Sequence, residues 1–164
     1  AGEALVITAW QGHPREARRD WRAVTARADN GAYVLDGTLH AVPHAASATH
    51  LLMPALLLDE PVICCVPRTA AGLELTEQVL ADGTRMARVD LRGVTLAETA
   101  LLGSGPLADA ALDAAIDGGT LLAACALAGI AREAFTLTLN FLKTREQFGR
   151  RIGSFQALQH RAVD

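Results

Sequence analysis

Leu142-Lys-Thr-Arg-Glu-Gln-Phe-Gly149 and Ile152-Gly-Ser-Phe-Gln156 are the segments that decide the fold of this chain. Gly149 and Gly153 predict a break between two helices, because glycine adopts backbone angles that other residues avoid. Ser154 is a residue type that caps helix amino ends, so we expect a second helix to begin directly after it. The two segments therefore predict a helix, a short loop and a second helix.

The segment before this loop has the pattern of one long helix. Pro106 suits the first turn of a helix, and no further proline occurs up to about Lys143. Apolar residues here follow helical spacing rather than alternation: Leu112, Ile116, Leu121, Leu122, Cys125, Leu127, Ile130, Phe135, Leu139 and Leu142. A run of this length indicates a helical bundle, which two helices alone do not close. We therefore expect further chain or another subunit to cover these helices.

The amino-terminal part of the chain has the pattern of short strands. Polar and apolar residues alternate at 21–27, and further strand-like runs occur at 32–35, 51–58, 62–66, 73–79, 86–91 and 94–96. Asp29-Asn-Gly31 and Asp36-Gly37 are typical of hairpin turns. Short strands separated by glycine, aspartate and proline favour an antiparallel β-barrel or sandwich. We predict an α+β chain, with a β-domain at 1–105 and the first helices of an incomplete bundle at 106–164.

Composition argues against several kinds of partner and location. With a net charge of −3 and 4% aromatic residues, the chain has no overall character of a nucleic-acid-binding protein. The longest charge-free run of the helical part, 118–131, is too short to span a membrane, so we expect no membrane span. Three cysteines, without a C-x-x-C pair or a leader, indicate reduced thiols and a cytoplasmic protein. Cys64 and Cys65 fall in a predicted buried strand, and we expect them to be core residues. Because there is no initiator methionine, we expect a piece of a longer protein.

Four basic residues crowd the predicted loop between the helices: Lys143, Arg145, Arg150 and Arg151. On one interpretation these cations stabilise the carbonyl end of the first helix, with Gly149 as its left-handed terminator. On the other interpretation they form an anion site, because a guanidinium offers a planar pair of donors to phosphate and a helix amino end adds N–H donors. The residues alone leave both interpretations open.

Arg145-Glu-Gln-Phe-Gly149, Ile152-Gly-Ser-Phe-Gln156 and Leu158-Gln-His160 resemble, without gaps, the segment that acyl-CoA dehydrogenases carry between the first two helices of their C-terminal bundle. The alanine-rich helix before it resembles the first helix of that bundle, and residues 1–105 resemble the family's middle β-domain more loosely. The resemblance covers nearly the whole chain but only the central part of a family member. It implies an FAD-dependent flavoprotein oxidoreductase of acyl-CoA metabolism that desaturates an acyl-CoA thioester between its α and β carbons.

The resemblance also implies a flavin site that lies across a subunit interface. In this family FAD lies between the middle β-domain of one subunit and the bundle of its neighbour, and the loop arginine reaches the neighbour's flavin pyrophosphate. That role falls on Arg145, with Gln147 and Phe148 beside it, and with Phe155 and Gln156 as a further contact. The implied partners are an acyl-CoA substrate, an electron-transfer flavoprotein or similar acceptor, and the other subunits of a homo- or hetero-oligomer.

The other half of the flavin site departs from the family pattern. The family's Thr-Glu-Pro-Gly stretch aligns near Ile7-Thr-Ala-Trp-Gln-Gly12, which keeps Thr8 as a flavin contact and loses the glutamate and the proline. The family's Trp-Ile-Thr triplet becomes Ala41-Val-Pro43, without the aromatic plate, the hydroxyl and one backbone donor. His13-Pro-Arg-Glu-Ala-Arg-Arg19 replaces a loop of glycine and serine near the thioester. We therefore expect this subunit's own β-domain to hold flavin poorly.

These departures raise two alternatives to a self-sufficient dehydrogenase subunit. One is a flavin-poor partner subunit of a heteromeric acyl-CoA dehydrogenase, similar to the small subunit of pimeloyl-CoA dehydrogenase-type enzymes. The other is a non-catalytic oligomerisation protein derived from the family.

We expect no catalytic residue and no metal ligand in this segment. Most family members place the catalytic glutamate on a later bundle helix, and the position that a minority use is Gly119 here. Asp117 nearby is interpreted as a solvated helix carboxylate. His40 and His44 are four residues apart, a metal-binding spacing on helices, but Pro43 between them excludes a helix interior.

Overall fold

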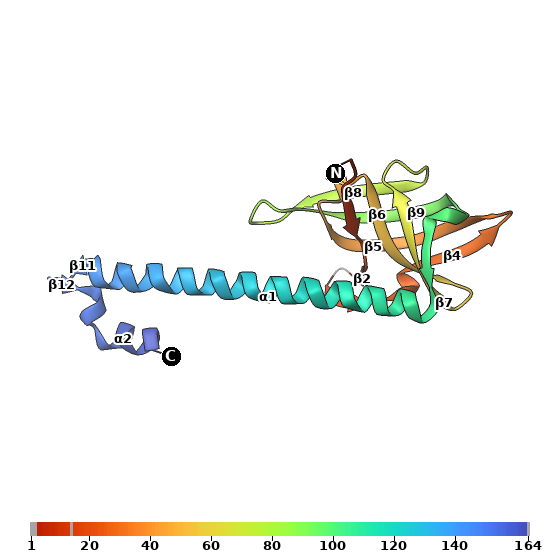
Figure 1. Ribbon diagram of the computed structural model, residues 1–164. Coiled ribbons are helices and arrows are strands. Elements are labelled where there is room, and N and C mark those ends of the chain that lie inside the picture. The colour runs from red at the N-terminus through yellow and green to blue at the C-terminus, as the bar shows by residue number, and fades with distance from the viewer. Residues whose placement is uncertain (1–2, 14, 164) are drawn as a thin grey trace. The chain divides into compact units, whose positions relative to one another are not determined.

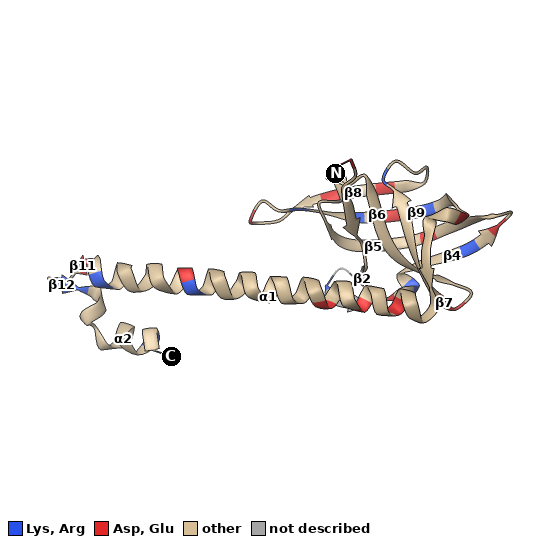
Figure 2. Ribbon diagram, in the orientation of Figure 1, with Lys and Arg blue, Asp and Glu red and all other residues tan. Residues whose placement is uncertain are grey.

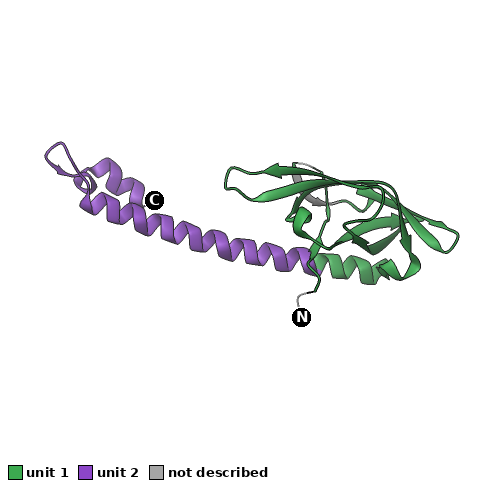
Figure 3. Cartoon of the chain, turned by 90° about the horizontal axis from the view of Figure 1, so that it is seen from above, with its two compact units in different colours: residues 1–113 green, residues 114–164 purple. Residues whose placement is uncertain are grey.

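A computed structural model describes residues 3–13 and 15–163 of the chain (Figure 1). The chain divides into two compact units, residues 1–113 and 114–164 (Figure 3). The first unit contains the main sheet and the first turns of the long helix α1 (Gly105–Thr144). The second contains the rest of α1 and the elements that follow it. The predicted division into domains at 105/106 stays a prediction, and Pro14 of the predicted replacement loop lies outside the described residues.

One eight-stranded sheet forms the first unit. Its strands are β1 (Val6–Thr8), β4 (Val24–Asp29), β5 (Ala32–Pro43), β6 (His50–Leu57), β7 (Glu60–Pro67), β8 (Leu73–Val79), β9 (Arg85–Ala97) and β10 (Leu101–Ser104). Along the sheet the order is β10-β7-β6-β4-β5-β9-β8, and β1 pairs with β6. β1 and β4 both run parallel to β6, whereas the remaining neighbours are antiparallel.

This topology confirms the α+β class and corrects the expected sheet. The predicted antiparallel barrel or sandwich is instead a mixed sheet, because β6 has parallel partners on its two short contacts with β1 and β4. Within the described residues no pairing joins the end strands β8 and β10, so the sheet is not a closed barrel. Alternation along each strand predicts a strand but does not specify the direction of its neighbour.

Glycines in β5 and β9 mark bulges where the sequence suggested turns or gaps. The turn at Asn30-Gly31 is confirmed, with φ angles of 49° and 80°. Asp36-Gly37 is not a turn, because β5 runs through it and shifts register against β9 there. A Cβ at Gly37 would collide with the carbonyl oxygen of Ala23, so glycine permits this close approach of two chain segments. Gly93 (φ 62°) lies inside β9, which joins two runs that we predicted as separate strands.

Buried side chains alternate with more exposed ones along the strands, as in β7, where Val62, Cys64 and Val66 are buried. Fully buried side chains of neighbouring strands complete this core: Leu35, Leu39, Leu51, Met53, Val24, Val42, Val89 and Val94. Burying one such side chain stabilises the fold by about 1.5–3 kcal/mol. Burial, with a smaller effect from Cys65, raises the pKa of Cys64 to about 11, so this thiol is protonated at neutral pH. The core interpretation is confirmed for Cys64, whereas Cys65 is half-buried.

Short elements connect and flank the sheet. They are the strand pair β2 (Gln11–His13) and β3 (Glu16–Arg19), and the 3₁₀ turns η1 (Trp21–Ala23), η2 (Ala45–Ser47) and η3 (Glu98–Ala100). The predicted strand at 21–27 begins only at Val24, because η1 precedes it. The carboxylate of Asp20 caps η1 by accepting a hydrogen bond from the backbone N–H of Arg22 at 3.0 Å.

In the second unit, α1 is followed by β11 (Glu146–Gln147), β12 (Arg150–Arg151), η4 (Ile152–Ser154) and α2 (Gln156–Val163). The predicted long helix and the second helix are both confirmed, each to within one residue at its start. The predicted cap at Ser154 is wrong, because α2 begins only at Gln156 and, among the described residues, no N–H of α2 donates to the Ser154 hydroxyl, which itself donates to the carbonyl oxygen of Arg151 at 2.8 Å. The loop between the helices also contains a strand pair that helix-ending signals did not predict.

Helix α1 is apolar over most of its 40 residues. Carboxylates mark its first third (Figure 2), and no charged residue occurs between Asp117 and Arg132. Its most apolar 18-residue window has a mean hydropathy of 1.7, so by length and composition α1 is able to cross a membrane. Our expectation of no membrane span considered only uninterrupted charge-free runs, so it did not identify this window. A helix that is apolar on all sides is also what the interior of a helical bundle requires.

Candidate functional site

The residues that the sequence singled out after α1 form a small hairpin, residues 145–152, which we call the hairpin. The backbone N–H of Arg145 donates to the carbonyl oxygen of Phe141 at 2.9 Å and so extends the last turn of α1. The carbonyl of Arg145 accepts from the N–H of Ile152 at 2.9 Å, which closes the base of the hairpin. Gln147 pairs with Arg150, so the connecting turn has only two residues, Phe148 and Gly149. Their φ angles of 56° and 77° are those of a type I′ turn.

An exposed aromatic ring stands at the tip of the hairpin. The side chain of Phe148 is 91% exposed. Its ring meets the half-buried ring of Phe155 edge to face, with centroids 6.2 Å apart and planes at 85°. The Cζ atom of Arg150 lies 4.1 Å from the centroid of the Phe155 ring, within the range of a cation–π contact. The hairpin and the residue before α2 therefore form one connected surface.

This surface carries the predicted cations. Among the described residues, none forms a hydrogen bond or ion pair with the guanidinium of Arg145, which is exposed. The structure also tests the predicted role of Gly149 as the terminator of the first helix. Gly149 is left-handed, as predicted, but it lies in the hairpin turn and not at the end of α1, which ends at Thr144. An unpaired, exposed guanidinium is suited to an anionic ligand.

A small pocket of about 260 Å³ lies at the base of the hairpin. Its lining residues are Leu142, Lys143, Arg151, Gly153 and Ser154. A Cβ at Gly153 would lie 2.7 Å from the carbonyl oxygen of Leu142, so glycine allows the returning chain to pass close to the end of α1. The sequence predicted Gly153 as a break, and the structure adds this packing requirement.

The predicted site residues therefore fall into two groups. Arg145, Gln147, Phe148, Phe155 and Gln156 all belong to the hairpin and the start of α2 in the second unit. Thr8 lies in the first unit, half-buried at the end of β1, where it pairs with Leu52 of β6.

The segment that aligns with the family's flavin-binding triplet has an unusual backbone. Ala41 has a φ of 51°, at a bulge between Leu39 and Val42 where β5 shifts register against β9. Pro43 is the last residue of β5 and is exposed. A methyl group and a ring without N–H offer no hydrogen-bond donor to the edge of an isoalloxazine. If the predicted alignment with that triplet holds, Ala41 and Pro43 lack the aromatic face and the hydroxyl that a flavin ring would contact.

Polar side chains beside this bulge form hydrogen bonds with one another. The hydroxyl of Thr38 donates to Oδ1 of Asp90 at 2.7 Å, and Arg88 donates to the same oxygen from Nε and Nη2 at 3.0 and 2.7 Å. Burial raises the pKa of Asp90, but these hydrogen bonds and the charges of Arg88 and Arg92 outweigh it, and the net pKa is lowered. Burial, and then the charge of Arg88, lower the pKa of His40, which is therefore neutral at pH 7.

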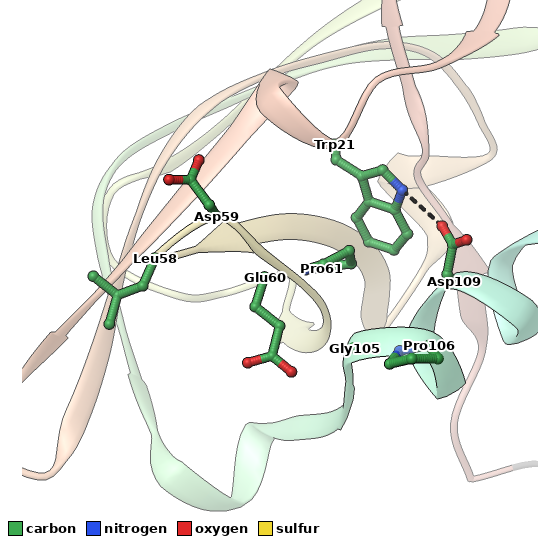
Figure 4. Close-up of a pocket in the computed structure, with 8 residues that line it drawn as sticks. All are labelled: Trp21, Leu58, Asp59, Glu60, Pro61, Gly105, Pro106 and Asp109. Atoms are coloured by element: carbon green, nitrogen blue, oxygen red, sulfur yellow. Dashed lines mark hydrogen bonds between the residues drawn. The ribbon is translucent and has the colours of Figure 1, made fainter.

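Sequence reasoning missed a pocket of about 540 Å³ in the first unit (Figure 4). It is lined by Trp21, Leu58, Asp59, Glu60, Pro61, Gly105, Pro106 and Asp109. The indole N–H of Trp21 donates to Oδ1 of Asp109 at 3.1 Å and so ties η1 to the first turns of α1. The lining residues come from separate parts of the chain, so no local sequence motif predicts the pocket. Its carboxylates make it unsuited to a phosphate ligand.

Metal binding finds no support in the geometry. Within residues 3–13 and 15–163, no group of three or more histidine, cysteine, aspartate or glutamate side chains is arranged to hold a metal ion. His40 lies within β5, and His44 follows that strand with a left-handed φ of 54°. The two histidines therefore lie on a strand and in the turn after it, and the expectation of no metal site stays a prediction.

Known proteins resemble this chain in both sequence and structure. A family model described as acyl-CoA dehydrogenase, C-terminal domain, matches residues 109–164. The probable acyl-CoA dehydrogenase YngJ of Bacillus subtilis is 32% identical over 102 residues, covering 60% of this chain and 27% of that protein. The acyl-CoA dehydrogenase IpdE2 of Mycobacterium tuberculosis is 48% identical over 48 residues, covering 29% of this chain and 15% of that protein.

Solved structures match nearly the whole chain. An acyl-CoA dehydrogenase from Geobacillus kaustophilus has a TM-score of 0.86 at 20% identity, over 99% of this chain and 45% of that chain, which shows the fold. The steroid ACAD Tcur3481-Tcur3483 has a TM-score of 0.77 at 30% identity, over 99% of this chain and 42% of that chain. The ChsE4-ChsE5 complex from Mycobacterium tuberculosis has a TM-score of 0.78 at 26% identity, over the same shares, 99% and 42%.

The match to residues 109–164 includes the hairpin, and the matches to solved structures include both the sheet and the helices. The chain spans 27% of YngJ and less than half of each solved chain, so it corresponds to a part of such proteins. Residues 109–164 match the C-terminal domain of the acyl-CoA dehydrogenase family, and nearly the whole chain shares the fold of the solved acyl-CoA dehydrogenase from Geobacillus kaustophilus.

Proposed function

We propose that this chain is part of an FAD-dependent acyl-CoA dehydrogenase that desaturates acyl-CoA thioesters, and that its hairpin binds the pyrophosphate of a flavin held by another subunit. The chemistry that bound FAD would supply is acceptance of the hydride from the β-carbon of the thioester. The observation that carries this proposal is the exposed Arg145 guanidinium, which has no partner among the described residues and stands at the base of a hairpin with an aromatic tip.

The chemistry of the hairpin fits a diphosphate with an attached aromatic group. Arg145 keeps its charge at any physiological pH and donates two parallel hydrogen bonds to phosphate oxygens. The N–H groups at the start of α2, which begins at Gln156, add donors of the type that bind phosphate. The exposed ring of Phe148 offers a flat apolar surface to the rest of the dinucleotide. In this proposal Gln147 and Phe155 complete the contact surface.

A second candidate function is that of the flavin-poor partner in a heteromeric acyl-CoA dehydrogenase. The specific observation is at Ala41 and Pro43, where this chain's own β-domain lacks the aromatic plate, the hydroxyl and one backbone donor of the family's flavin-binding triplet. The hairpin of such a subunit would bind the flavin of a partner subunit. Thr8 would then be retained without contacting a flavin. The similarity to the ChsE4-ChsE5 complex, which contains two differently named chains, supports this candidate.

The remaining functional assignments follow from similarity to this family and belong to the same proposal. The substrate is an acyl-CoA, the electron acceptor is an electron-transfer flavoprotein or a similar protein, and the assembly is an oligomer in the cytoplasm. We propose that α1 is a helix of the bundle at 106–164, covered by other helices, rather than a membrane span.

Co-purification tests the choice between the two candidates. The full-length protein is produced alone and together with the subunit proposed to hold the flavin, and flavin absorbance per mole of protein is measured after gel filtration. Flavin that appears only in the co-produced complex supports the partner role. Stoichiometric flavin in the protein purified alone contradicts that role and supports the self-sufficient subunit.

A further inference from the structure

Three side chains of the hairpin region, Arg150, Phe155 and Phe148, are in contact in series. The guanidinium of Arg150 lies on the ring of Phe155, 4.1 Å from its centroid, and the ring of Phe148 meets Phe155 at 85° with centroids 6.2 Å apart. These residues come from β12, from the residue before α2 and from the hairpin tip. Phe155 is thus in contact with both other side chains, so the position of Arg150 affects Phe148 through it.

The tip needs such support, because its conformation is not favoured by its own sequence. Phe148 has a φ of 56°, in the left-handed region that bulky residues avoid. Its ring is 91% exposed, so little burial within the chain offsets this strain. An unsupported ring at this position would sample several orientations, and ordering it on binding would weaken affinity.

We infer that Arg150 is a positioning residue for the flavin site, which holds Phe148 in its binding orientation by covering Phe155. This inference rests on the proposed function of the hairpin and adds a residue to it. Arg150 acts through the two rings, whereas Arg145 binds the pyrophosphate directly. A flat guanidinium covers the face of a ring more fully than an ammonium group does, so we expect a positive charge alone to replace it only in part.

The test uses the full-length protein assembled with the subunit that holds the flavin. Apo-protein is titrated with FAD for the wild type, Arg150→Ala, Arg150→Lys and the charge-matched control Arg161→Ala on the exposed side of α2. We expect Arg150→Ala to weaken FAD binding about fivefold, the upper end for the loss of one cation–π contact of an exposed arginine. With Arg150→Lys, we expect less than half of the change in the logarithm of the FAD dissociation constant to be recovered. With Arg161→Ala, we expect a dissociation constant within about twofold of the wild-type value.

A double-mutant cycle separates positioning from charge. In a Phe148→Leu background, Arg150→Ala is expected to weaken FAD binding by less than about twofold, because the ring that it positions is gone. The effect of Arg150→Ala in the wild-type background persists in high salt, which screens exposed charges. Full recovery in Arg150→Lys, or an Arg150→Ala effect independent of Phe148, overturns the inference.

The same titration keeps this inference distinct from the proposed function. If Arg145→Ala weakens FAD binding while Arg150→Ala does not, only the positioning role fails. If Arg145→Ala also leaves FAD binding unchanged, the proposed function of the hairpin itself fails.

Discussion

At Asp90, hydrogen bonds from Thr38 and Arg88 converge on one carboxylate oxygen that is nearly buried, and they decide how the fold responds to pH. Because the folded pKa of Asp90 is lowered, its stabilisation is complete above the ordinary pKa of about 4 and is lost as the pH falls through the folded value. Asp90→Asn should therefore reduce the free energy of unfolding by about 1–3 kcal/mol at pH 7. Urea unfolding at pH 7 and pH 3 checks this. We expect the difference between the wild type and the variant to shrink at pH 3, and an equal difference at both pH values would contradict the assignment.

Gly37 illustrates a residue whose requirement comes from its neighbours. Gly31→Ala should cost about 1–2 kcal/mol, because only the left-handed φ of 80° opposes the new side chain. Gly37→Ala should cost more, about 3 kcal/mol or above, because the added Cβ also meets the backbone of Ala23. Thermal or urea unfolding of the two variants measures both losses. Equal losses would show that the contact with Ala23 is relieved by a small shift.

Single residues were predictable from the sequence where the chain places them side by side. Arg145, Gln147 and Phe148 lie on one hairpin because they are nearly contiguous. The bond between Trp21 and Asp109 was not predictable, because it joins residues 88 positions apart. Glycines were correctly marked as special, but the sequence did not say whether a turn, a bulge or a close approach was the reason.

At the scale of elements, two hairpin turns hold a large apolar residue with positive φ. Phe148 and Leu58 have φ angles of 56° and 49°, and both side chains are 91% exposed. Asparagine accepts this conformation more readily than either residue. We expect Phe148→Asn and Leu58→Asn each to leave the free energy of unfolding unchanged or to raise it by up to about 1 kcal/mol.

Only one of these two substitutions should affect the flavin. Flavin content after purification of the assembled protein should fall for Phe148→Asn and stay at the wild-type level for Leu58→Asn. Equal flavin content in both variants would mean that the exposed ring of Phe148 has no part in the site. Both substitutions relieve strain in a turn, but only Phe148→Asn removes a proposed ligand contact. The comparison therefore separates these two effects.

The strands and helices were predictable to the extent that each has its own periodicity. The runs at 51–58, 62–66 and 73–79 correspond to β6, β7 and β8, because alternation with a buried face is a local property. The failures occurred at bulges, at the 3₁₀ turn before β4, and in the direction of pairing with β6. These features depend on which segments become neighbours, and that information is distributed over the whole chain.

At the scale of the whole molecule, α1 is the element that most needs a partner. Large apolar side chains along it are exposed in the isolated chain: Leu121, Leu122, Leu127, Ile130, Phe135, Leu137 and Phe141. The sequence predicted that a bundle of two helices leaves such faces uncovered, and the exposed side chains agree with this. The identity of the covering helices was not predictable, because apolar side chains specify burial but not a particular partner.

The hairpin likewise has its proposed ligand, the pyrophosphate of FAD, outside the chain. The protein is purified together with its flavin-holding subunit, carrying Arg145→Ala, Arg145→Lys or the control Arg161→Ala. The ratio of bound FAD to protein and the FAD dissociation constant are then measured. We expect Arg145→Ala to bind FAD at least about tenfold more weakly and Arg145→Lys to fall between it and the wild type, because lysine keeps the charge but loses the two-donor fork. Arg161→Ala should retain wild-type flavin. Wild-type flavin content and affinity in Arg145→Ala would contradict the claim that this hairpin binds the flavin of another subunit.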